Sequence, residues 1–255
     1  MNDNNNKPKV TIITPSFNSE KNIEETILSV LNQTYANLEY IIIDGGSTDG
    51  TVDIIKKYQN RLAYWISEPD KGISDAFNKG LTKATGDYIN FQGAGDYLIS
   101  DTVIESIMAD VDPEEDMLVC GKIERIRDTK KKEVVFTSSI NFKNKRSLLF
   151  RMSLPHQALF TNKKFFEKYG NFDLNNKFCM DYEILLRAYK NFPKVILKDI
   201  IVSAWREGGV GKDKTLEIFK EYLSIKKKNE VTPVWILYII HGWSIFKYYI
   251  KNKLK

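Results

Sequence analysis

The sequence contains few of the residues that bind transition metals or cross-link secreted domains. Its 255 residues include two histidines and two cysteines, Cys120 and Cys179. Two histidines exclude a histidine-rich metal site. The cysteines lie in apolar surroundings without metal-ligand spacing, which argues against a disulfide framework and indicates a reducing compartment. A chain of this length buries a substantial core without such cross-links.

The N-terminus has no long apolar run. Residues 1–7 are polar and rich in asparagine, and they lack the apolar core of a signal peptide. We therefore expect a disordered tail at 1–7 and residence in the cytoplasm. The net charge is a modest +5, and much of the lysine lies toward the C-terminus. This bias favours an acidic surface near the tail as a partner, and not nucleic acid.

The first part of the chain alternates apolar runs with amphipathic stretches. We expect strands at 10–14, 40–43, 62–67 and 88–92, and helices at 20–33, 51–58 and 75–84, with Ser19 as the first N-cap. The second strand is nearly all apolar, as in a sheet covered on both faces. The alternation predicts an α/β fold with a parallel sheet and right-handed crossovers.

The pattern changes after residue 100. We expect a hairpin of 117–127 and 133–139 around a charged turn at 128–132, and further strands at 155–160, 195–197 and 200–206. The expected helices are 101–110, 163–169, 181–189 and 214–229. With no internal repeat or long linker, the halves 8–100 and 101–211 are expected to share one sheet, followed by C-terminal helices in 212–255.

The segment 234–250 combines aromatic and aliphatic residues and is flanked by lysines. Its length is near the lower limit of roughly 17 residues for a spanning helix. Its apolar run is interrupted at His241, Gly242, Ser244 and Lys247. Aromatic residues beside basic ones suit the membrane–water interface. We therefore expect a helix that lies on the cytosolic face of the membrane; the alternative is a helix packed on the domain or in a dimer.

The stretch 85–96 places one carboxylate at the end of an expected strand. Gly93, Ala94 and Gly95 leave space beside Asp96. The carboxyl edge of an open α/β sheet is where ligands bind, and small residues allow a metal and a polyanion to approach the backbone. The alternative is a turn aspartate that accepts hydrogen bonds from local amides.

Six segments together resemble the motifs of one family. They are residues 10–20, 41–51, 70–80, 86–96, 155–157 and 180–187. In this order they are similar to the inverting family 2 glycosyltransferases of the GT-A fold, of the bacterial surface-polysaccharide type. The resemblance covers about residues 8–210. It implies a Rossmann-like nucleotide-sugar-binding half with a central, mostly parallel sheet, continuous with a mixed acceptor-binding half.

The resemblance implies a set of donor-binding residues. Asp44 would accept hydrogen bonds from the base, with an Asx-turn as the alternative. The other residues are Pro15, Phe17 and Asn18 for the base pocket, Glu20 near the nucleoside, Asp75 and Asn78 near the ribose and diphosphate, and Arg206, which with Trp205 and the loop 208–211 would close over the phosphates. Phe17 as a core residue, Asp75 paired with its helix dipole and a structural Arg206 stay open as alternatives.

The resemblance also assigns the chemistry. Asp96 would hold a divalent metal, Mn²⁺ or Mg²⁺, against the donor diphosphate, although Ala94 stands where many relatives have a second Asp. Asp181 would be the general base, with a helix N-cap as the alternative. His156 and Gln157 would belong to the acceptor pocket.

The implied activity is transfer of a sugar, from a UDP-sugar by preference, to a glycan or polyisoprenoid-linked saccharide at the inner face of the cell membrane. The alternative is a catalytically weak or inactive sugar-nucleotide-binding scaffold, which Ala94 favours and the retention of Asp96 and Asp181 disfavours. A nucleotidyltransferase would show a Gly-rich basic loop, and residues 15–18 lack both features. The sequence leaves the sugar, the linkage and the oligomeric state open.

Overall fold

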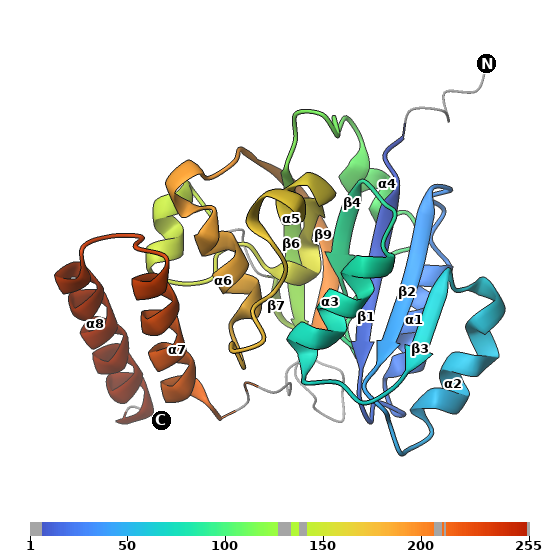
Figure 1. Cartoon of the computed structure of the whole chain (residues 1–255), viewed down its shortest axis with the longest axis horizontal. Coiled ribbons are helices and arrows are strands. Elements are labelled where there is room, and N and C mark those ends of the chain that lie inside the picture. The colour runs from blue at the N-terminus through green and yellow to red at the C-terminus, as the bar shows by residue number, and fades with distance from the viewer. Residues whose placement is uncertain (1–6, 127–133, 138–141, 207–210, 212, 254–255) are drawn as a thin grey trace.

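One mixed sheet joins both halves of the chain, as Figure 1 shows. The computed structural model describes residues 7–126, 134–137, 142–206, 211 and 213–253. Within these ranges the sheet has 9 strands in the order β3-β2-β1-β4-β8-β6-β9-β5, and β7 pairs with β6 beside this path. The expectation of a shared sheet is confirmed.

The first half is the expected parallel unit. Its strands are β1 (Val10–Ser16), β2 (Leu38–Asp44), β3 (Tyr64–Ser67) and β4 (Tyr88–Phe91), and all neighbouring pairs among them run parallel. The connecting helices are α1 (Ile23–Leu31), α2 (Thr51–Tyr58) and α3 (Ile73–Lys83). The Ser19 side chain does not cap α1; its backbone carbonyl instead accepts hydrogen bonds from Asn22 and Ile23.

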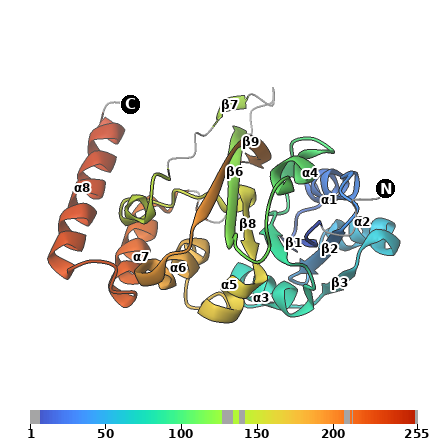
Figure 2. The ribbon, with the colours of Figure 1, turned by 90° about the horizontal axis from the view of Figure 1, so that it is seen from above.

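Helices cover the sheet on both faces. Along β1, Ile12 faces the layer of α1, α2 and α4, while Ile13 faces α3 and the helices of the second half. Figure 2 shows α1 and α4 on one side of the sheet and α3, α5 and α6 on the other. Because successive side chains of a strand point to opposite faces, a continuous β-branched run supplies both core layers.

The second half is mixed. It contains β5 (Tyr97–Leu98), α4 (Val103–Met108), β6 (Leu118–Ile126), β7 (Val134–Thr137), η3 (Lys145–Leu149), η4 (His156–Ala158), β8 (Leu159–Asn162), α5 (Lys163–Tyr169), α6 (Met180–Arg187), η5 (Tyr189–Asn191) and β9 (Val195–Arg206). The β6–β7 pair is antiparallel, as expected for the hairpin, and its turn at 128–132 lies outside the described residues. β8 runs antiparallel to both β4 and β6.

The expected strands at two places differ from the structure, and one short strand has no counterpart among the expected elements. The expected strand at 155–160 is a 3-10 turn, η4, followed by β8, because Pro155 precedes a turn and not a ladder residue. The two strands at 195–206 are one strand, β9, whose pairing with β6 shifts register opposite Cys120–Lys122–Ile123. The short strand β5 was not expected.

Two further helices form a hairpin beside the sheet. They are α7 (Thr215–Lys228) and α8 (Val234–Lys253), and α7 packs against α6. On α8 only Leu237 and Ile240 are buried, so most of its apolar side chains remain exposed. No helix within the described part of the chain is both long enough and apolar enough to cross a membrane.

Candidate active site

The predicted site residues gather at the carboxyl edge of the sheet. β1, β2, β4, β6 and β9 run in one direction, so Ser16, Asp44 and Arg206 end their strands at this edge. β8 runs the opposite way and therefore starts at the same edge, which brings His156 and Gln157 to it from a distant part of the chain.

Asp96 is held in a tight loop after β4. Gly95 has a φ of 115°, which favours glycine, and its N–H donates to Thr26 Oγ1 at 2.8 Å. The Thr26 hydroxyl in turn donates to the carbonyl of Asp96 at 2.7 Å. The Asp96 carboxylate is buried and accepts hydrogen bonds from the Arg206 backbone N–H at 3.1 Å and from Gln157 Nε2 at 3.1 Å.

Asp181 lies in the first turn of α6 and faces His156. His156 Nδ1 is 3.2 Å from Asp181 Oδ2, and Asp181 Oδ1 accepts from the Tyr182 N–H at 2.8 Å. The N-cap of α6 is Cys179, so the alternative of Asp181 as an N-cap is not what the structure shows. About a fifth of the Asp181 side chain is exposed, at 22%.

Two consecutive residues connect the two acids. Gln157 contacts Asp96 and His156 contacts Asp181, so the segment after Pro155 lies between both carboxylates. Burial raises the pKa of Asp96 above its ordinary value. Partial burial acts to lower the pKa of His156, but the hydrogen bond and charge of Asp181 outweigh it and raise the pKa. The charges of both Asp181 and Asp96 therefore favour the protonated form of His156.

Buried amides fix this bridge, and the sequence did not point to them. Gln92 Nε2 donates to the Gln157 carbonyl at 2.7 Å and to Asn90 Oδ1 at 2.7 Å, while Asn90 Nδ2 donates to the Leu159 carbonyl at 3.0 Å. Ser203 on β9 donates to Gln92 Oε1 at 2.8 Å. Since buried polar groups require partners, one amide within the buried strand β4 and another directly after it were the signal available in the sequence.

Asp44 is enclosed by protein donors. Its carboxylate accepts from the hydroxyls of Ser16, Ser47 and Ser67 and from the N–H groups of Gly46 and Ser47. Burial acts to raise the pKa of Asp44, but these hydrogen bonds outweigh it and lower the pKa. The Asx-turn left open by the sequence is present. Contact with a base stays a prediction, and it requires a serine hydroxyl to turn away.

The side chains at the end of β1 and in the loop that follows differ in their exposure and in their contacts. Phe17 is 62% exposed, which rules out a core position, whereas Pro15 is buried within β1. Asn18 has a φ of 47°, and its Oδ1 accepts from the Thr48 N–H at 2.9 Å. Glu20 is exposed, and its backbone N–H donates to Asp49. The loop therefore offers one aromatic surface beside a fixed backbone.

Asp75 and Asn78 both engage the protein itself. Asp75 Oδ2 accepts from the Lys71 N–H at 3.0 Å and lies 3.8 Å from Lys79 Nζ. Asn78 Nδ2 donates to the Phe172 carbonyl, and Asn78 Oδ1 accepts from the Phe172 N–H, both at 2.9 Å. The Asn78 amide thus clamps the loop before α6. Donor contact by either residue stays a prediction.

Arg206 supports the Asp96 loop. Its guanidinium donates to Glu25 at 2.6 Å and to the Gly95 carbonyl at 3.3 Å. This is the structural role that the sequence left open, while its approach to donor phosphates stays a prediction. Of the expected closing loop 208–211, residues 208–210 lie outside the described residues.

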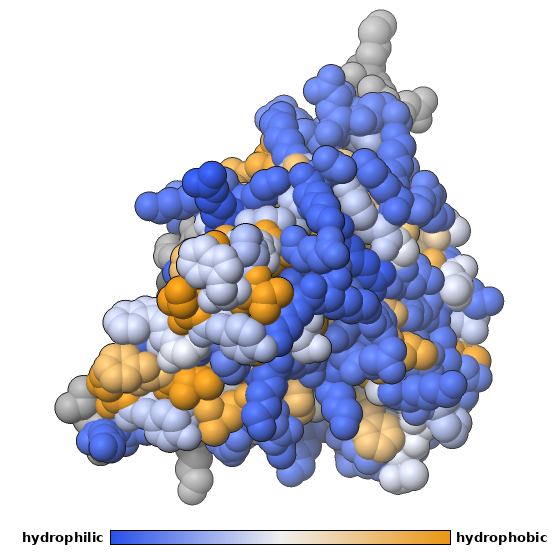
Figure 3. Space-filling view, turned by 60° about the vertical axis from the view of Figure 1, so that its left-hand side comes forward, coloured by the Kyte–Doolittle hydropathy of each residue, from blue (hydrophilic) through white to orange (hydrophobic). Residues whose placement is uncertain are grey.

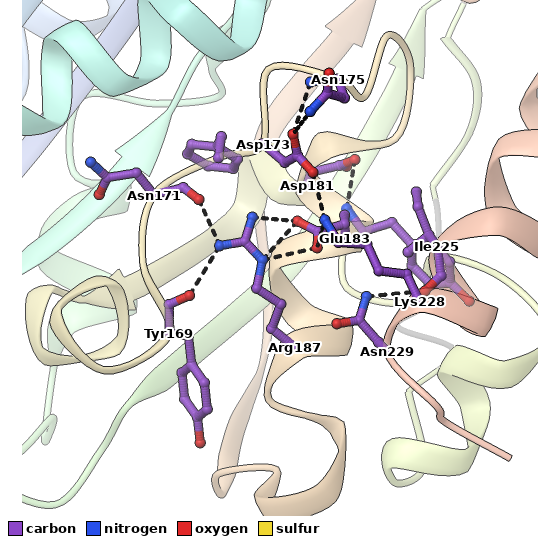
Figure 4. A network of polar contacts seen from close by, with 12 residues as sticks. Tyr169, Asn171, Asp173, Asn175, Asp181, Glu183, Arg187, Ile225, Lys228 and Asn229 are labelled. Atoms are coloured by element: carbon purple, nitrogen blue, oxygen red, sulfur yellow. Dashed lines mark hydrogen bonds and ion pairs between the residues drawn. The ribbon is translucent and has the colours of Figure 1, made fainter.

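A polar network ties α6 to the chain before it and to α7 (Figure 4). The buried Glu183 carboxylate accepts from Arg187 Nε, and Arg187 Nη1 donates to the carbonyls of Tyr169 and Asn171. Lys228 of α7 pairs with Asp173 at 2.6 Å. Glu183 is therefore committed to Arg187, which leaves Asp181 as the exposed acid of this helix.

The residues at this edge fit a metal that takes few protein ligands. No group of three or more His, Cys, Asp or Glu side chains within the described ranges is arranged to hold a cation. Asp96 presents a buried carboxylate that accepts hydrogen bonds from a backbone N–H and from a neutral amide. Such a donor set suits Mg²⁺ or Mn²⁺ held mainly by phosphate oxygens, and it does not form an all-protein cage.

The chain is similar in sequence to known glycosyltransferases. A family model described as glycosyl transferase family 2 matches residues 11–186. An uncharacterized glycosyltransferase of Mycobacterium tuberculosis is 32% identical over 190 residues, covering 71% of this chain and 69% of the relative. A PGL/p-HBAD biosynthesis glycosyltransferase of Mycobacterium bovis is 28% identical over 227 residues, covering 85% of this chain and 83% of the relative.

Solved structures share the fold. TarS 1–349 of S. aureus in complex with UDP matches with a TM-score of 0.67 at 19% identity, covering 93% of this chain and 70% of that one. The mannosyltransferase PcManGT of Pyrobaculum calidifontis, in complex with GDP-Man and Mn²⁺, matches with a TM-score of 0.67 at 18% identity, covering 95% and 70%. The expected GT-A architecture is confirmed.

Proposed function

Because the chain belongs to glycosyltransferase family 2, we propose that it transfers a sugar with inversion from a nucleotide-diphosphate donor to a hydroxyl of a glycan or lipid-linked saccharide. A UDP-sugar is the favoured donor. One observation carries the proposal: His156 and Gln157, consecutive in the chain, contact Asp181 and Asp96. Asp96, proposed for the donor side, and Asp181, proposed for the acceptor side, thus both contact the segment of His156 and Gln157.

The chemistry assigned to the chain's own residues is proton removal and orientation. The acceptor oxygen attacks the anomeric carbon, the bond from that carbon to the diphosphate oxygen breaks, and the nucleoside diphosphate leaves with the electron pair. Asp181 Oδ2 takes the acceptor proton. His156 beside this oxygen orients the carboxylate, and Glu183 is excluded from the role by its pairing with Arg187.

The proposed metal ligand is Asp96. A divalent cation there would neutralise charge on the departing diphosphate. In the variant Asp96→Ala we expect donor binding to weaken and to become insensitive to EDTA, measured by calorimetry with Mn²⁺ and with EDTA. Unchanged affinity and unchanged EDTA sensitivity would remove Asp96 from the metal site.

The proposed location is the inner surface of the cell membrane, reached through α8. Its exposed apolar side chains include Trp235, Ile239, Phe246 and Ile250, and Lys247, Lys251 and Lys253 lie on the same helix. Figure 3 shows orange and pale side chains in a band on the face that carries the C-terminal helices, with blue around it. A polar-flanked aromatic helix suits the interface of an anionic bilayer.

The direct test is transfer by the variant Asp181→Asn. We expect a loss of about 100- to 10,000-fold in kcat, the usual contribution of a general base, with donor affinity close to wild type. Thermal stabilisation by a panel of UDP, GDP and dTDP sugars identifies the donor to use. Normal turnover in Asp181→Asn would refute the mechanism. Donor binding by the wild type without any transfer would support the inactive scaffold instead.

A further inference from the structure

A hollow whose lining includes neither Asp96 nor Asp181 lies beside the two C-terminal helices. It is open to solvent, with a volume of about 790 Å³, and it is bordered by the start of α7, the last turns of α8, and η3 with the chain just after it. This volume is in the range of small-molecule sites. Figure 1 shows that α7 begins and α8 ends at the lower end of the molecule, where the parallel strands also end. The hollow and the catalytic edge therefore share one end.

The lining of the hollow carries positive charges that no acidic residue of the lining balances. Arg151, Lys247 and Lys251 line the hollow, and its lining contains no Asp or Glu. None of the three has a carboxylate partner in the part of the chain that the structure describes. Lys247 lies over the Trp243 ring at 5.0 Å. Three cations around one concave surface repel each other, so an anion bound there would relieve the repulsion.

The arrangement of the charges suits a phosphate group. Lys247 and Lys251 are four residues apart on α8 and project from one face, while Arg151 comes from the segment after η3. Thr215, the first residue of α7, adds the positive end of a 14-residue helix to the lining. Arginine and lysine together with a helix N-terminus are the groups that bind phosphate oxygens in proteins.

The remaining walls are aromatic and lead to the exposed face of α8. They are formed by Phe150, Phe219, Trp243 and Tyr248. Trp243 is also 53% exposed and belongs to the apolar face proposed to meet the membrane. A ligand in this hollow can thus place an anionic group on the cations and an apolar chain along the aromatic side chains toward the bilayer.

We propose that this hollow binds the diphosphate of a lipid-linked saccharide acceptor. The inference rests on the proposed function, and it specifies the acceptor class and where its diphosphate sits. A diphosphate carries twice the charge of the single phosphodiester in a phospholipid, so three unpaired cations match it better. Arg151 at the hollow is five positions before His156, which contacts Asp181, so the two lie within about 18 Å along the chain. A saccharide attached to the diphosphate can bridge such a span to the general base.

The test is calorimetric titration of the full chain with farnesyl diphosphate, a soluble lipid diphosphate. We expect the triple variant R151Q/K247Q/K251Q to bind at least about tenfold more weakly than wild type, since charge-assisted contacts are lost. The charge-matched control K56Q/K57Q/K168Q removes three cations from α2 and α5 and is expected to bind as wild type. Equal affinity in wild type and the R151Q/K247Q/K251Q variant would overturn the proposal, as would no binding by wild type.

Two further arms separate the sources of binding. Because a diphosphate can also enter the donor site, the titration is repeated on the variant Asp96→Ala in the presence of EDTA. We expect its affinity for farnesyl diphosphate to equal that of wild type. A loss of affinity in this variant would show that the ligand binds at the donor site, and it would overturn the proposal. Displacement by an equal concentration of dihexanoyl phosphatidylglycerol would also overturn it. The enzyme could also fail to transfer a sugar from every donor while farnesyl diphosphate binding still depends on Arg151, Lys247 and Lys251. That result would count against the proposed function alone.

Discussion

The contribution of Phe17 to donor binding can be tested separately from its contribution to the stability of the fold. Its ring is 62% exposed beside the loop that carries Asn18, so it contributes little to the core. If the ring packs on the donor base, Phe17→Ala removes a stacking contact worth about 1–3 kcal/mol. We expect the donor dissociation constant to rise by about 5- to 150-fold with the melting temperature unchanged, measured by calorimetry and thermal unfolding. Wild-type affinity in this variant would place the base elsewhere.

His156 links the site to pH. Its folded pKa is raised above 6.5 because Asp181 outweighs partial burial. A raised histidine pKa stabilises the fold below the unfolded pKa, and this stabilisation is lost as the pH rises through the folded pKa. We therefore expect the difference in unfolding free energy between wild type and His156→Asn to be largest below pH 6.5 and to shrink at higher pH, in urea titrations across pH.

The second histidine of the chain provides the control for this experiment. Burial lowers the pKa of His241, and Lys226 and Lys227 lower it further. A lowered histidine pKa gives stability that is present at high pH and is lost as the pH falls below the unfolded pKa. The His241→Asn difference should therefore change with pH in the opposite direction. Parallel trends for the two variants would contradict the assigned contact between His156 and Asp181.

The helix that carries Asp181 depends on a residue of α7. Glu221 accepts hydrogen bonds from the N–H groups of Phe178 and Cys179 at 3.0 and 2.8 Å, directly before α6 begins. The N-terminal N–H groups of a helix otherwise lack partners, so this carboxylate acts as a cap supplied by another helix. A helix outside the family match thus fixes the start of the helix that presents Asp181.

Glu221→Ala tests this coupling between helices. We expect a loss of about 1 kcal/mol in unfolding free energy, typical of a lost cap. We also expect a lower kcat with an unchanged KM for the donor, because α6 then positions Asp181 less firmly. Glu217→Ala removes a carboxylate that pairs with Lys214 at the surface of the same helix and should change neither quantity. A kcat equal to wild type in Glu221→Ala would make the cap purely structural.

At the level of the complete chain, the carboxyl edge of the sheet and the ends of the C-terminal helices lie at the same end of the molecule. The parallel strands end at the lower end of Figure 1, where α7 starts and α8 ends. Exposed apolar side chains lie along α8. A peripheral enzyme that uses a lipid-linked acceptor needs its catalytic edge and its membrane contact close together. The positive charge of the lysines on α8 then favours anionic lipid.

The apolar face of α8 gives the corresponding prediction. The variant W235S/I239S/F246S removes three exposed apolar side chains and leaves the buried Leu237 and Ile240 in place. We expect its partition into phosphatidylglycerol vesicles to fall by at least about tenfold, since each such side chain contributes on the order of 1.5 kcal/mol when buried. Cosedimentation measures this partition.

A matched control uses L28S/L174S/L197S, which removes exposed leucines from other parts of the surface. Vesicle binding of this variant should equal that of wild type. If instead the face pairs two copies of the chain, W235S/I239S/F246S would change the molecular mass in light scattering and leave vesicle binding as it was. That outcome would replace the membrane proposal with the dimer left open by the sequence.

Local sequence determined much of the fold and part of the site. The β-branched runs and turn glycines predicted β1 to β4 and α1 to α3, and the position of Asp96 after a strand followed from Gly93 to Gly95. These features are local, because a strand or a turn depends on neighbouring residues and on period. The order of the motifs likewise sufficed to predict the family and the GT-A fold.

Only the tertiary structure decided which partners each side chain has. Four sets of contacts join residues far apart in the chain: Ser16 and Ser67 with Asp44, Asn78 with Phe172, Arg206 with Glu25, and Glu221 with the start of α6. The hollow with Arg151, Lys247 and Lys251 likewise joins η3 to α8. Such contacts depend on how β8 reverses direction and how α7 folds back, and no local pattern encodes the pairing of distant polar groups.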